Sequence, residues 1–571
     1  MNDGHDYHPT NKWVLFGHHF AAIAGAGPLI GPVLAAQFGF LPGAIWIIIG
    51  AVAAGAVHDY VILFASVRHN GLSFHKIARD YIGFTTGIAT AIAVLFIIIT
   101  ALAGLSIVVV NALSESAWGT FAIAVSIPAA IFVGLYMYVL RKGQIIEASV
   151  IGTAMLLAGV FFGYFVQHSG MAFAFTFTKQ QLAILLPVYG FAASVLPVWL
   201  LLAPRDYLSS YLKIGTVALL AIGIFFVNPI IKMPAFTPFI HGGGPIIPGK
   251  VWPFVCITIA CGAISGFHSL ISSGTTPKMV TNEKEIRMIG YGAMLVEGFV
   301  AIMALIAATV LIPADYFAIN CTPAAFGKLG LSPVNLPFLS KMVQENVAAR
   351  PGGAVSLAVG MAQIFSGIPG MKNLMGYWYH FAIMFEALFI LTTIDAGTRV
   401  ARYILQEVVG KAIKPFADTK WIPGVLITSF LVVLAWGYLV YNGDISTIWP
   451  MFGVANQLLA TVALVIGTTV IMKLNKDKRY ALVTFIPMLF MLATTVTAGV
   501  ENIFYNYLPQ GTFNGNLNAF LSAAMLLLVL IIVIDSGVKW LLFIKKHGFV
   551  ERRLEKEKKT REKEPAMELD I

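Results

Sequence analysis

The sequence predicts an all-α polytopic membrane protein, and three observations support this prediction. Hydrophobic residues make up 58% of the 571 residues, whereas charged residues make up only 11%. Apolar runs long enough to cross the roughly 30 Å hydrocarbon core of a bilayer recur along the whole chain. These runs lack the alternation of apolar and polar residues that is typical of a transmembrane β-barrel.

We expect about 14 transmembrane helices in a single domain, residues 1–545, followed by a charged cytoplasmic tail, residues 546–571. The expected spans are 14–37, 41–66, 84–112, 119–140, 144–167, 181–203, 212–231, 252–276, 288–312, 373–397, 423–441, 447–472, 480–500 and 517–544. The apolar stretch 352–370 is short and flanked by Gly and Pro. We therefore expect a re-entrant or surface-packed helix there, inside a long outer loop, 313–372.

The charge distribution predicts the orientation of the chain. With both termini in the cytoplasm, most of the 37 Lys and Arg residues fall in cytoplasmic connections. The net charge of +10 therefore indicates topology, and the expected partner is the lipid bilayer with no nucleic acid. The N-terminus lacks the basic region of a cleaved signal, so the first apolar segment should remain. The three cysteines fit neither a disulfide framework nor a metal site, and we expect no metal and no cofactor.

Two short stretches, HFAAIAGAGP (19–28) and HSLISSGTTP (268–277), interrupt apolar segments. Both read His, five residues, Gly, two residues, Pro. Under the expected topology they run in opposite directions through the membrane, which is the pattern of an inverted-repeat transporter with two broken helices. An unwound backbone at membrane depth requires a polar cavity or surrounding protein. The alternative is a chance match between small-residue stretches that promote close helix packing.

A half-helix that begins at such an interruption directs N–H groups and a partial positive charge toward an anion. The expected substrate-binding residues are His19, Gly25, Ala26, Gly27, His268, Ser272, Ser273, Gly274, Thr275, Thr276 and Asn456. The alternative for the histidines is a hydrogen bond to a neighbouring carbonyl. For Asn456 the alternative is a polar contact between helices.

Ionisable residues inside apolar segments are costly and mark functional sites. We expect Asp59, Glu297 and Glu386 to couple protons, since desolvation can hold a carboxyl group near neutral pKa. The alternative for each is a structural ion pair or a helix-capping contact. Four further residues are expected to form gate or structural ion pairs, Arg205 with Asp206 and Asp395 with Arg399.

Six motifs closely resemble the carbon starvation protein A (CstA) family of bacterial inner-membrane transporters. They are GHHFAAIAGAGPLIGPVLAAQFG, AGAVHDY, LLAPRDYL, CGAISGFHSLISSGTTPKM, TTIDAGTRVARY and MFGVANQLLA. The resemblance extends from about residue 15 to about residue 470, and it departs at His58, where many relatives have Gln. It implies uptake of pyruvate or of peptides, driven by the proton gradient. It also implies an inverted-repeat core similar to that of LeuT/APC-like transporters.

The expected function is therefore secondary active import of a small carboxylate, most simply pyruvate, coupled to protons through alternating access. Sodium remains an alternative coupling ion, because the same carboxylates and amides can bind it. A cation-coupled peptide or amino-acid permease is the alternative function. A membrane-bound enzyme is disfavoured by the lack of catalytic motifs, and a channel by the lack of a repeated filter. The sequence gives no indication of oligomeric state.

Overall fold

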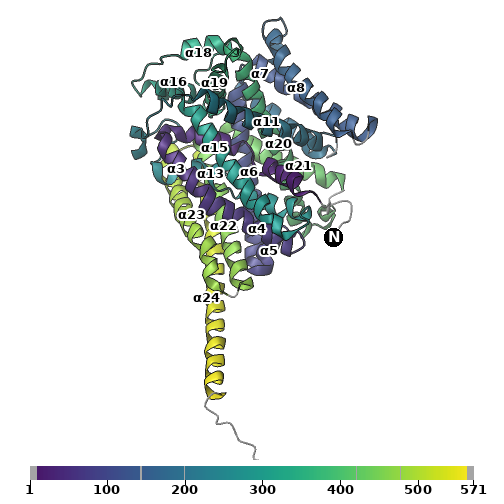
Figure 1. Ribbon diagram of the computed structural model, residues 1–571, viewed down its shortest axis with the longest axis vertical. Coiled ribbons are helices and arrows are strands. Elements are labelled where there is room, and N and C mark those ends of the chain that lie inside the picture. Colours follow the sequence, from purple (N-terminus) through teal and green to yellow (C-terminus); the bar gives the residue numbers. More distant parts are fainter. Residues whose placement is uncertain (1–9, 142–143, 198–199, 419–420, 476, 562–571) are drawn as a thin grey trace, which may run out of the picture.

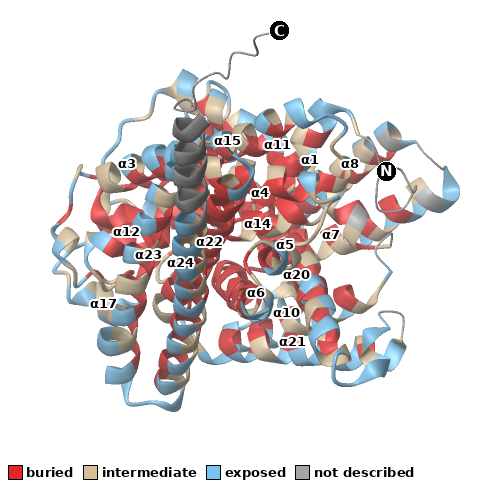
Figure 2. Ribbon diagram, turned by 90° about the horizontal axis from the view of Figure 1, so that it is seen from below, coloured by how far each residue is buried: buried red, intermediate tan, exposed pale blue. Residues whose placement is uncertain are grey.

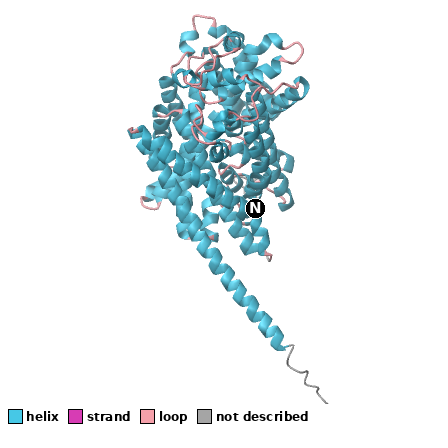
Figure 3. Cartoon of the chain, turned by 90° about the vertical axis from the view of Figure 1, so that its left-hand side faces the viewer, coloured by secondary structure: helices cyan, strands magenta, loops and turns pink. Residues whose placement is uncertain are grey.

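The structure, a computed structural model, describes residues 10–141, 144–197, 200–418, 421–475 and 477–561. Within these ranges all regular elements are helices (Figure 3). Of the expected tail, residues 562–571 lie outside the described residues. The part that is described continues the last helix as far as Arg561.

Eleven helices are long and apolar enough to cross a membrane, or twelve if one bent pair counts as a single span. The eleven are α3–η2–α4 (Phe40–Arg68), α6 (Phe84–Leu113), α7 (Ala117–Leu135), α8 (Ile145–Gln167), α11 (Leu202–Val227), α15 with the turns before it (Glu283–Thr309), α20 (Met375–Gly410), α21 (Ile422–Asn442), α22 (Ile445–Leu474), α23 (Leu482–Glu501) and α24 (Phe513–Arg561). The bent pair is α1 (Lys12–Ile23) and α2 (Gly27–Ala35), which a 3-10 turn extends to Phe38.

Two of the fourteen expected spans are not among these twelve. The expected span 181–203 corresponds to α10 (Lys179–Val195), which has 17 residues. The expected span 252–276 is divided into three short helices, α12 (Val251–Thr258), α13 (Ala260–Ala263) and α14 (Phe267–Ser273). The sequence predicts one span there with an interruption near Gly274, whereas the structure interrupts the segment earlier, at Ile259 and at Ile264–Gly266.

The first span bends by 48° at Ala24–Ala26. The helix α2 can begin directly after this bend because Pro28 lies in its first turn, where a missing N–H costs nothing. The second interruption, Ile264–Gly266, contains no proline. Gly266 is required there, since a Cβ atom would lie 2.3 Å from the backbone oxygen of Asn456.

The helix α22 forms the centre of the molecule and is buried on almost all sides (Figure 2). It packs against α6, α23 and α24, and α6 packs in turn against α20. A capping box starts α22, in which the Asp444 side chain accepts the N–H of Thr447 at 3.1 Å. A helix buried all round cannot be amphipathic, so its polar residues must find partners on neighbouring helices.

The region 313–372 contains four short helices and a 3-10 turn. The helices are α16 (Pro313–Asn320), α17 (Pro323–Gly327), α18 (Leu336–Val343) and α19 (Ala354–Ser366). With 13 residues α19 is too short to span a membrane, and it packs against α15, α20 and α11. The expected short helix is therefore present, but it is buried within the protein and does not lie on its surface.

The helix α11 begins at Leu202, ten residues before the expected span at 212. The sequence predicts a loop there, because charged residues near the start of α11 are typical of a connection between spans. Two short α-helices lie in connections between the longer ones, α5 (Phe74–Tyr81) and α9 (Ala172–Phe175). At the other end of the chain, α24 extends well beyond the helical bundle (Figure 1).

Candidate functional site

Two histidines and two carboxylates from three helices form a connected cluster inside the bundle. Nδ1 of His268, on α14, lies 2.8 Å from Asp59 Oδ2 on α4, and its Nε2 lies 3.2 Å from Glu297 Oε2 on α15. His58 Nδ1 lies 2.6 Å from the other oxygen of Asp59. All four side chains are buried. The imidazole of His268 is thus hydrogen-bonded to one carboxylate and lies at ion-pair distance from a second, which is far from the first in the sequence.

Both carboxylates follow a π-helical turn in their own span. The turn η2 (Ala51–Gly55) precedes Asp59, and η7 (Arg287–Gly292) precedes Glu297. Such a turn inserts a residue and rotates everything after it, and it is frequent at functional sites. Here the rotation directs both carboxylates toward α14.

The first interrupted span joins this region through His19. Its Nδ1 lies 2.8 Å from Oγ1 of Thr276, in the turn that follows α14. Both side chains are buried, and His19 Nε2 has no hydrogen-bond partner among the described residues. The sequence match had placed these two segments at corresponding points of two repeats, and the structure brings them into contact.

Asn456, on α22, accepts hydrogen bonds from backbone N–H groups at the second interruption, where the helical hydrogen bonds are missing. Its Oδ1 accepts the Phe267 N–H at 3.0 Å, and its backbone oxygen accepts the Gly266 N–H at 3.2 Å. Oδ1 also accepts a bond from the Ser265 hydroxyl at 3.2 Å. Asn456 therefore holds the unwound backbone in place, and in this structure its amide is used by the protein itself.

The two matched stretches occupy different structural positions, which corrects the sequence analysis. Gly25 lies between two half-helices, whereas Gly274 lies at the end of α14. The interruption within the second segment is at Ile264–Gly266, upstream of the expected residues. A His–Gly–Pro pattern fits a helix end as well as a mid-span break, so the sequence could not distinguish the two.

The remaining expected substrate residues differ in their surroundings. Ala26 and Gly27 are buried at the start of α2. The Ser273 hydroxyl donates to the Ser269 carbonyl of its own helix at 2.6 Å, and the buried Ser272 hydroxyl has no partner among the described residues. Thr275 is exposed.

Glu386 is buried on α20 away from the cluster. Neither of its carboxylate oxygens is hydrogen-bonded within the described part of the chain. Within the described residues, no ion pair joins it to His268, Asp59 or His19. The structure therefore brings two of the three expected proton-coupling residues together and leaves the third apart.

Lys213, on α11, is a buried residue of this region that the sequence analysis missed. Its ammonium donates to the Ala21 carbonyl at 2.9 Å, in the last turn of α1, and lies 4.2 Å from the ring centre of Phe389. The end of a helix carries a partial negative charge and unpaired carbonyls, which attract a cation. The sequence feature that could have indicated this contact is the position of Lys213 at the edge of an apolar run. A lysine at such an edge normally marks the end of a transmembrane span.

The expected ion pairs are rearranged. Asp395, on α20, lies 3.4 Å from Arg205 of α11, and it accepts a 2.7 Å bond from the Tyr189 hydroxyl of α10. Arg205 also donates to Tyr189. Arg399 donates to the Ala193 carbonyl at 2.7 Å. Within the described residues, the ion pair of Asp395 is with Arg205 on the adjacent helix, and none is formed with Arg399 one turn away.

A cluster of this kind can hold and transfer protons. Two carboxylates joined through one imidazole titrate as a unit, since each proton that enters changes the energy of the others. Because the cluster is buried, a change in its net charge is costly unless a ligand or a conformational change compensates for it. Proton binding can in this way be coupled to opening or closing of the helices that carry the cluster.

Comparisons with known proteins agree with the motifs. The model of the family described as "Carbon starvation protein CstA" matches residues 1–498. The peptide transporter CstA of Bacillus subtilis is 53% identical over 543 residues, covering 95% of this chain and 90% of the relative. The peptide transporter CstA of Escherichia coli is 48% identical over 529 residues, covering 88% of this chain and 75% of the relative. The pyruvate/proton symporter BtsT of Escherichia coli is 45% identical over 557 residues, covering 90% of this chain and 77% of the relative.

Among solved structures, a mutant of the Eremococcus coleocola manganese transporter aligns with a TM-score of 0.43 and 11% identity, covering 94% of this chain and 99% of that one. The relatives are named as transporters, and none of these names is that of an enzyme. The chain is a multi-pass membrane transporter, and it belongs to the carbon starvation protein CstA family.

Proposed function

We propose that the protein imports a small carboxylate, pyruvate in the simplest case, together with protons through alternating access. The observation that supports this most directly is the buried link from Asp59 through His268 to Glu297, beside the interrupted helices α1–α2 and α12–α14. The name of the related pyruvate/proton symporter supports the same substrate and coupling ion. The carboxylate would bind near the start of α2, within reach of the free His19 Nε2 and the Ser272 hydroxyl.

Lys213 supports proton coupling over sodium coupling. A sodium ion needs a set of oxygen ligands, and the carbonyls at the end of a half-helix could supply several of them. In this protein the Lys213 ammonium already donates to the Ala21 carbonyl there. We further propose a core of two inverted repeats, both termini in the cytoplasm, and Glu386 as a second proton-binding residue.

The experiment is uptake of labelled pyruvate into proteoliposomes that contain the purified protein. Parallel samples have an inward proton gradient, an inward sodium gradient, or neither. We expect accumulation only with the proton gradient. Glu297→Gln should abolish this accumulation while pyruvate exchange across the membrane persists, because a neutral amide cannot carry the proton.

The matched control is Asp535→Asn, which neutralises a carboxylate on α24 that pairs with Lys539 outside the cluster. This variant should accumulate pyruvate normally. Normal accumulation by Glu297→Gln would show that the cluster is not the proton path. If dipeptides are accumulated and pyruvate is not, the substrate is a peptide, as the names of the other relatives suggest, and the coupling proposal stands.

A further inference from the structure

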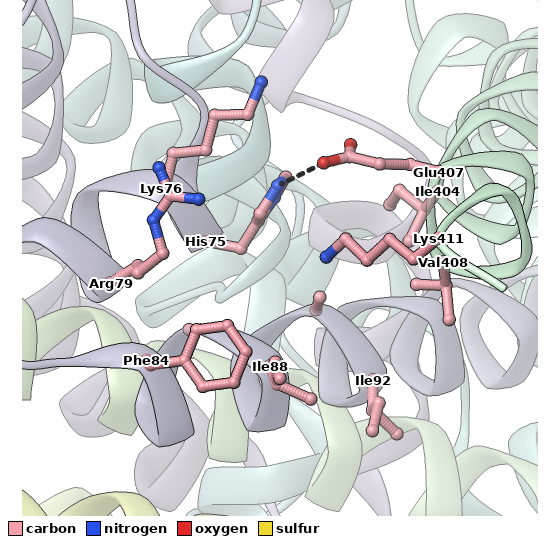
Figure 4. A pocket seen from close by; sticks show the side chains of 12 residues that line it. His75, Lys76, Arg79, Phe84, Ile88, Ile92, Ile404, Glu407, Val408 and Lys411 are labelled. Atoms are coloured by element: carbon pink, nitrogen blue, oxygen red, sulfur yellow. Dashed lines mark ion pairs between the residues drawn. The ribbon is translucent and has the colours of Figure 1, made fainter. Parts of the chain in front are cut away.

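A pocket opens on the surface where α5, the start of α6 and the end of α20 meet (Figure 4). It lies away from the interrupted helices and contains none of the residues discussed above. Charged side chains form one side of the pocket, and apolar side chains of α6 form the other.

The charged side carries three cations, Lys76 and Arg79 from α5 and Lys411 from the end of α20 (Figure 4). Two carboxylates partly offset them. Glu407 lies 3.5 Å from His75 Nε2, and Asp80 lies 3.4 Å from Arg79. Burial lowers the pKa of His75, so the positive charge of the pocket comes from the lysines and the arginine and persists at neutral pH.

The apolar side is a stripe on α6 formed by Phe84, Ile88 and Ile92, which are 70%, 39% and 42% exposed. These residues recur every fourth position and therefore lie on one face of the helix. The stripe is about 12 Å long, given a rise of 1.5 Å per residue. Gly87 and Ala91 also line the pocket, and because their side chains are small the surface of α6 is recessed there.

The position of the pocket relative to the spans favours a lipid over a soluble anion as its ligand. The helix α5 lies in the connection between the spans Phe40–Arg68 and Phe84–Leu113, so its cations lie at the edge of the bilayer. The stripe on α6 runs from this edge into the span. A soluble phosphate compound would bind the cations and leave the stripe uncovered, whereas a phospholipid covers both.

We propose that this pocket binds one anionic phospholipid, with its phosphate between Lys76, Arg79 and Lys411 and an acyl chain along Phe84, Ile88 and Ile92. Basic residues at the membrane surface attract anionic lipid headgroups. The bound lipid joins α5 to the end of α20. Because α20 also carries Glu386 and Asp395, the lipid contacts a helix that runs deep into the bundle.

The test is a titration of the purified full-length protein in detergent with phosphatidylglycerol or phosphatidylcholine, with bound lipid counted by native mass spectrometry. We expect one saturable phosphatidylglycerol site. Lys76→Gln combined with Lys411→Gln should weaken this site about 30-fold, which corresponds to the loss of two surface charges. Ile88→Asn combined with Ile92→Asn should weaken it as well, because the acyl chain loses its apolar surface.

The control is Lys284→Gln combined with Arg287→Gln, which removes two exposed cations from another connection. That connection lies on the same side of the protein, since Glu283 contacts Arg68 at the end of α4. The control should bind phosphatidylglycerol within about twofold of the wild type. Equal weakening by the control would show a general surface attraction and overturn the proposal.

Two measurements on the wild type avoid variants that fail to fold. A photo-crosslinking phosphatidylglycerol should label peptides from 74–92 and 404–411, and labelling confined to other segments would contradict the proposal. Glycerol phosphate at millimolar concentration should not displace the lipid. Displacement would identify the site as one for a soluble phosphate compound and overturn the proposal.

Discussion

At the scale of single residues, His268 has a carboxylate at each of its two ring nitrogens, Asp59 at 2.8 Å and Glu297 at 3.2 Å. Neither carboxylate can change its charge without affecting the other, because both interact with the same imidazole. His58 adds a second imidazole on the far side of Asp59. The four side chains therefore form one contiguous buried cluster, and a substitution at any one of them removes a contact of its neighbour.

Lys213 gives a prediction at the same scale. Lys213→Met should lower proton-driven pyruvate uptake by roughly tenfold or more, since the Ala21 carbonyl loses its donor in a buried place. Sodium should partly restore uptake by this variant, because the vacated carbonyl end of α1 can attract a free cation. The measurement is the initial uptake rate in sodium and in potassium buffers.

The matched control is Lys473→Met. Lys473, in the last turn of α22, also donates its ammonium to a backbone carbonyl, that of Tyr81 at 2.6 Å. Its variant should transport at close to the wild-type rate. Lys213→Met with full uptake and no response to sodium would show that the ammonium serves only to stabilise the fold.

The sequence singled out most residues of the buried cluster and its surroundings, because charged and polar residues inside apolar runs are conspicuous. It found His19, His268, Asp59, Glu297 and Asn456. It did not find which residues pair, since the contacts of His268 depend on how three helices cross. It also missed Lys213, which the sequence analysis placed at a helix end where lysines are common.

At the scale of elements, the two interrupted spans cross at very short distance. A Cβ on Gly31 of α2 would lie 2.5 Å from the Thr258 backbone oxygen at the end of α12. A backbone atom cannot move aside as a flexible side chain can. Contact between these half-helices is thus possible only while position 31 is glycine.

Gly31→Ala should accordingly destabilise the protein by roughly 1–3 kcal/mol, because the two helices must separate to accommodate the methyl group. The measurement is the thermal midpoint of the purified protein in detergent. Gly17→Ala is the control, since no atom lies within 4 Å of the Cβ that it would add. It should stabilise α1 by about 0.5–1 kcal/mol. If Gly31→Ala lowers the stability of the protein less than an average surface substitution does, the close crossing of the two helices is contradicted.

The sequence predicted the long helices well, since a run of apolar residues is sufficient evidence for them. The prediction was less accurate where a segment is apolar but its helix is interrupted, and where a helix continues through charged residues. The sequence predicts the interruption of 252–276 near Gly274, too late in the chain, because Ile264–Gly266 carries no signal stronger than a single glycine. The start of α11 was missed for the opposite reason, because charged residues continue a helix there through contacts with α10 and α20.

At the scale of the whole molecule, Glu345 links the region 313–372 to the main bundle. It accepts a hydrogen bond from Ser116, which also caps α7, and its side chain is 4% exposed. Burial raises the pKa of Glu345 to about 7, against the opposing effects of Arg350 and the Ser116 hydroxyl. The protonated form is therefore the one that the fold favours.

Stability should consequently depend on pH. Between its usual pKa near 4.5 and about 7, Glu345 holds a proton in the folded state that the unfolded state has released. The free energy of unfolding therefore falls as pH rises through this window, and it levels off above it. Glu345→Gln should remove this contribution, on the order of 1–3 kcal/mol between pH 5 and pH 8.

The measurement is the thermal midpoint at pH 5 and pH 8 for the wild type, for Glu345→Gln and for the control Glu115→Gln. Glu115 is an exposed carboxylate next to Ser116. The control should keep the wild-type difference between the two pH values. If Glu345→Gln keeps it too, another group is responsible for the dependence.

The last helix, α24, leaves the bundle and continues from Lys545 to Arg561 (Figure 1). At 1.5 Å per residue this extension is about 24 Å long. The Debye length in a physiological salt solution is about 8 Å, so the end of α24 lies roughly three such lengths from the end of the span. A pH-sensitive fluorophore attached there would report the bulk solution and would be almost insensitive to the surface potential of the membrane.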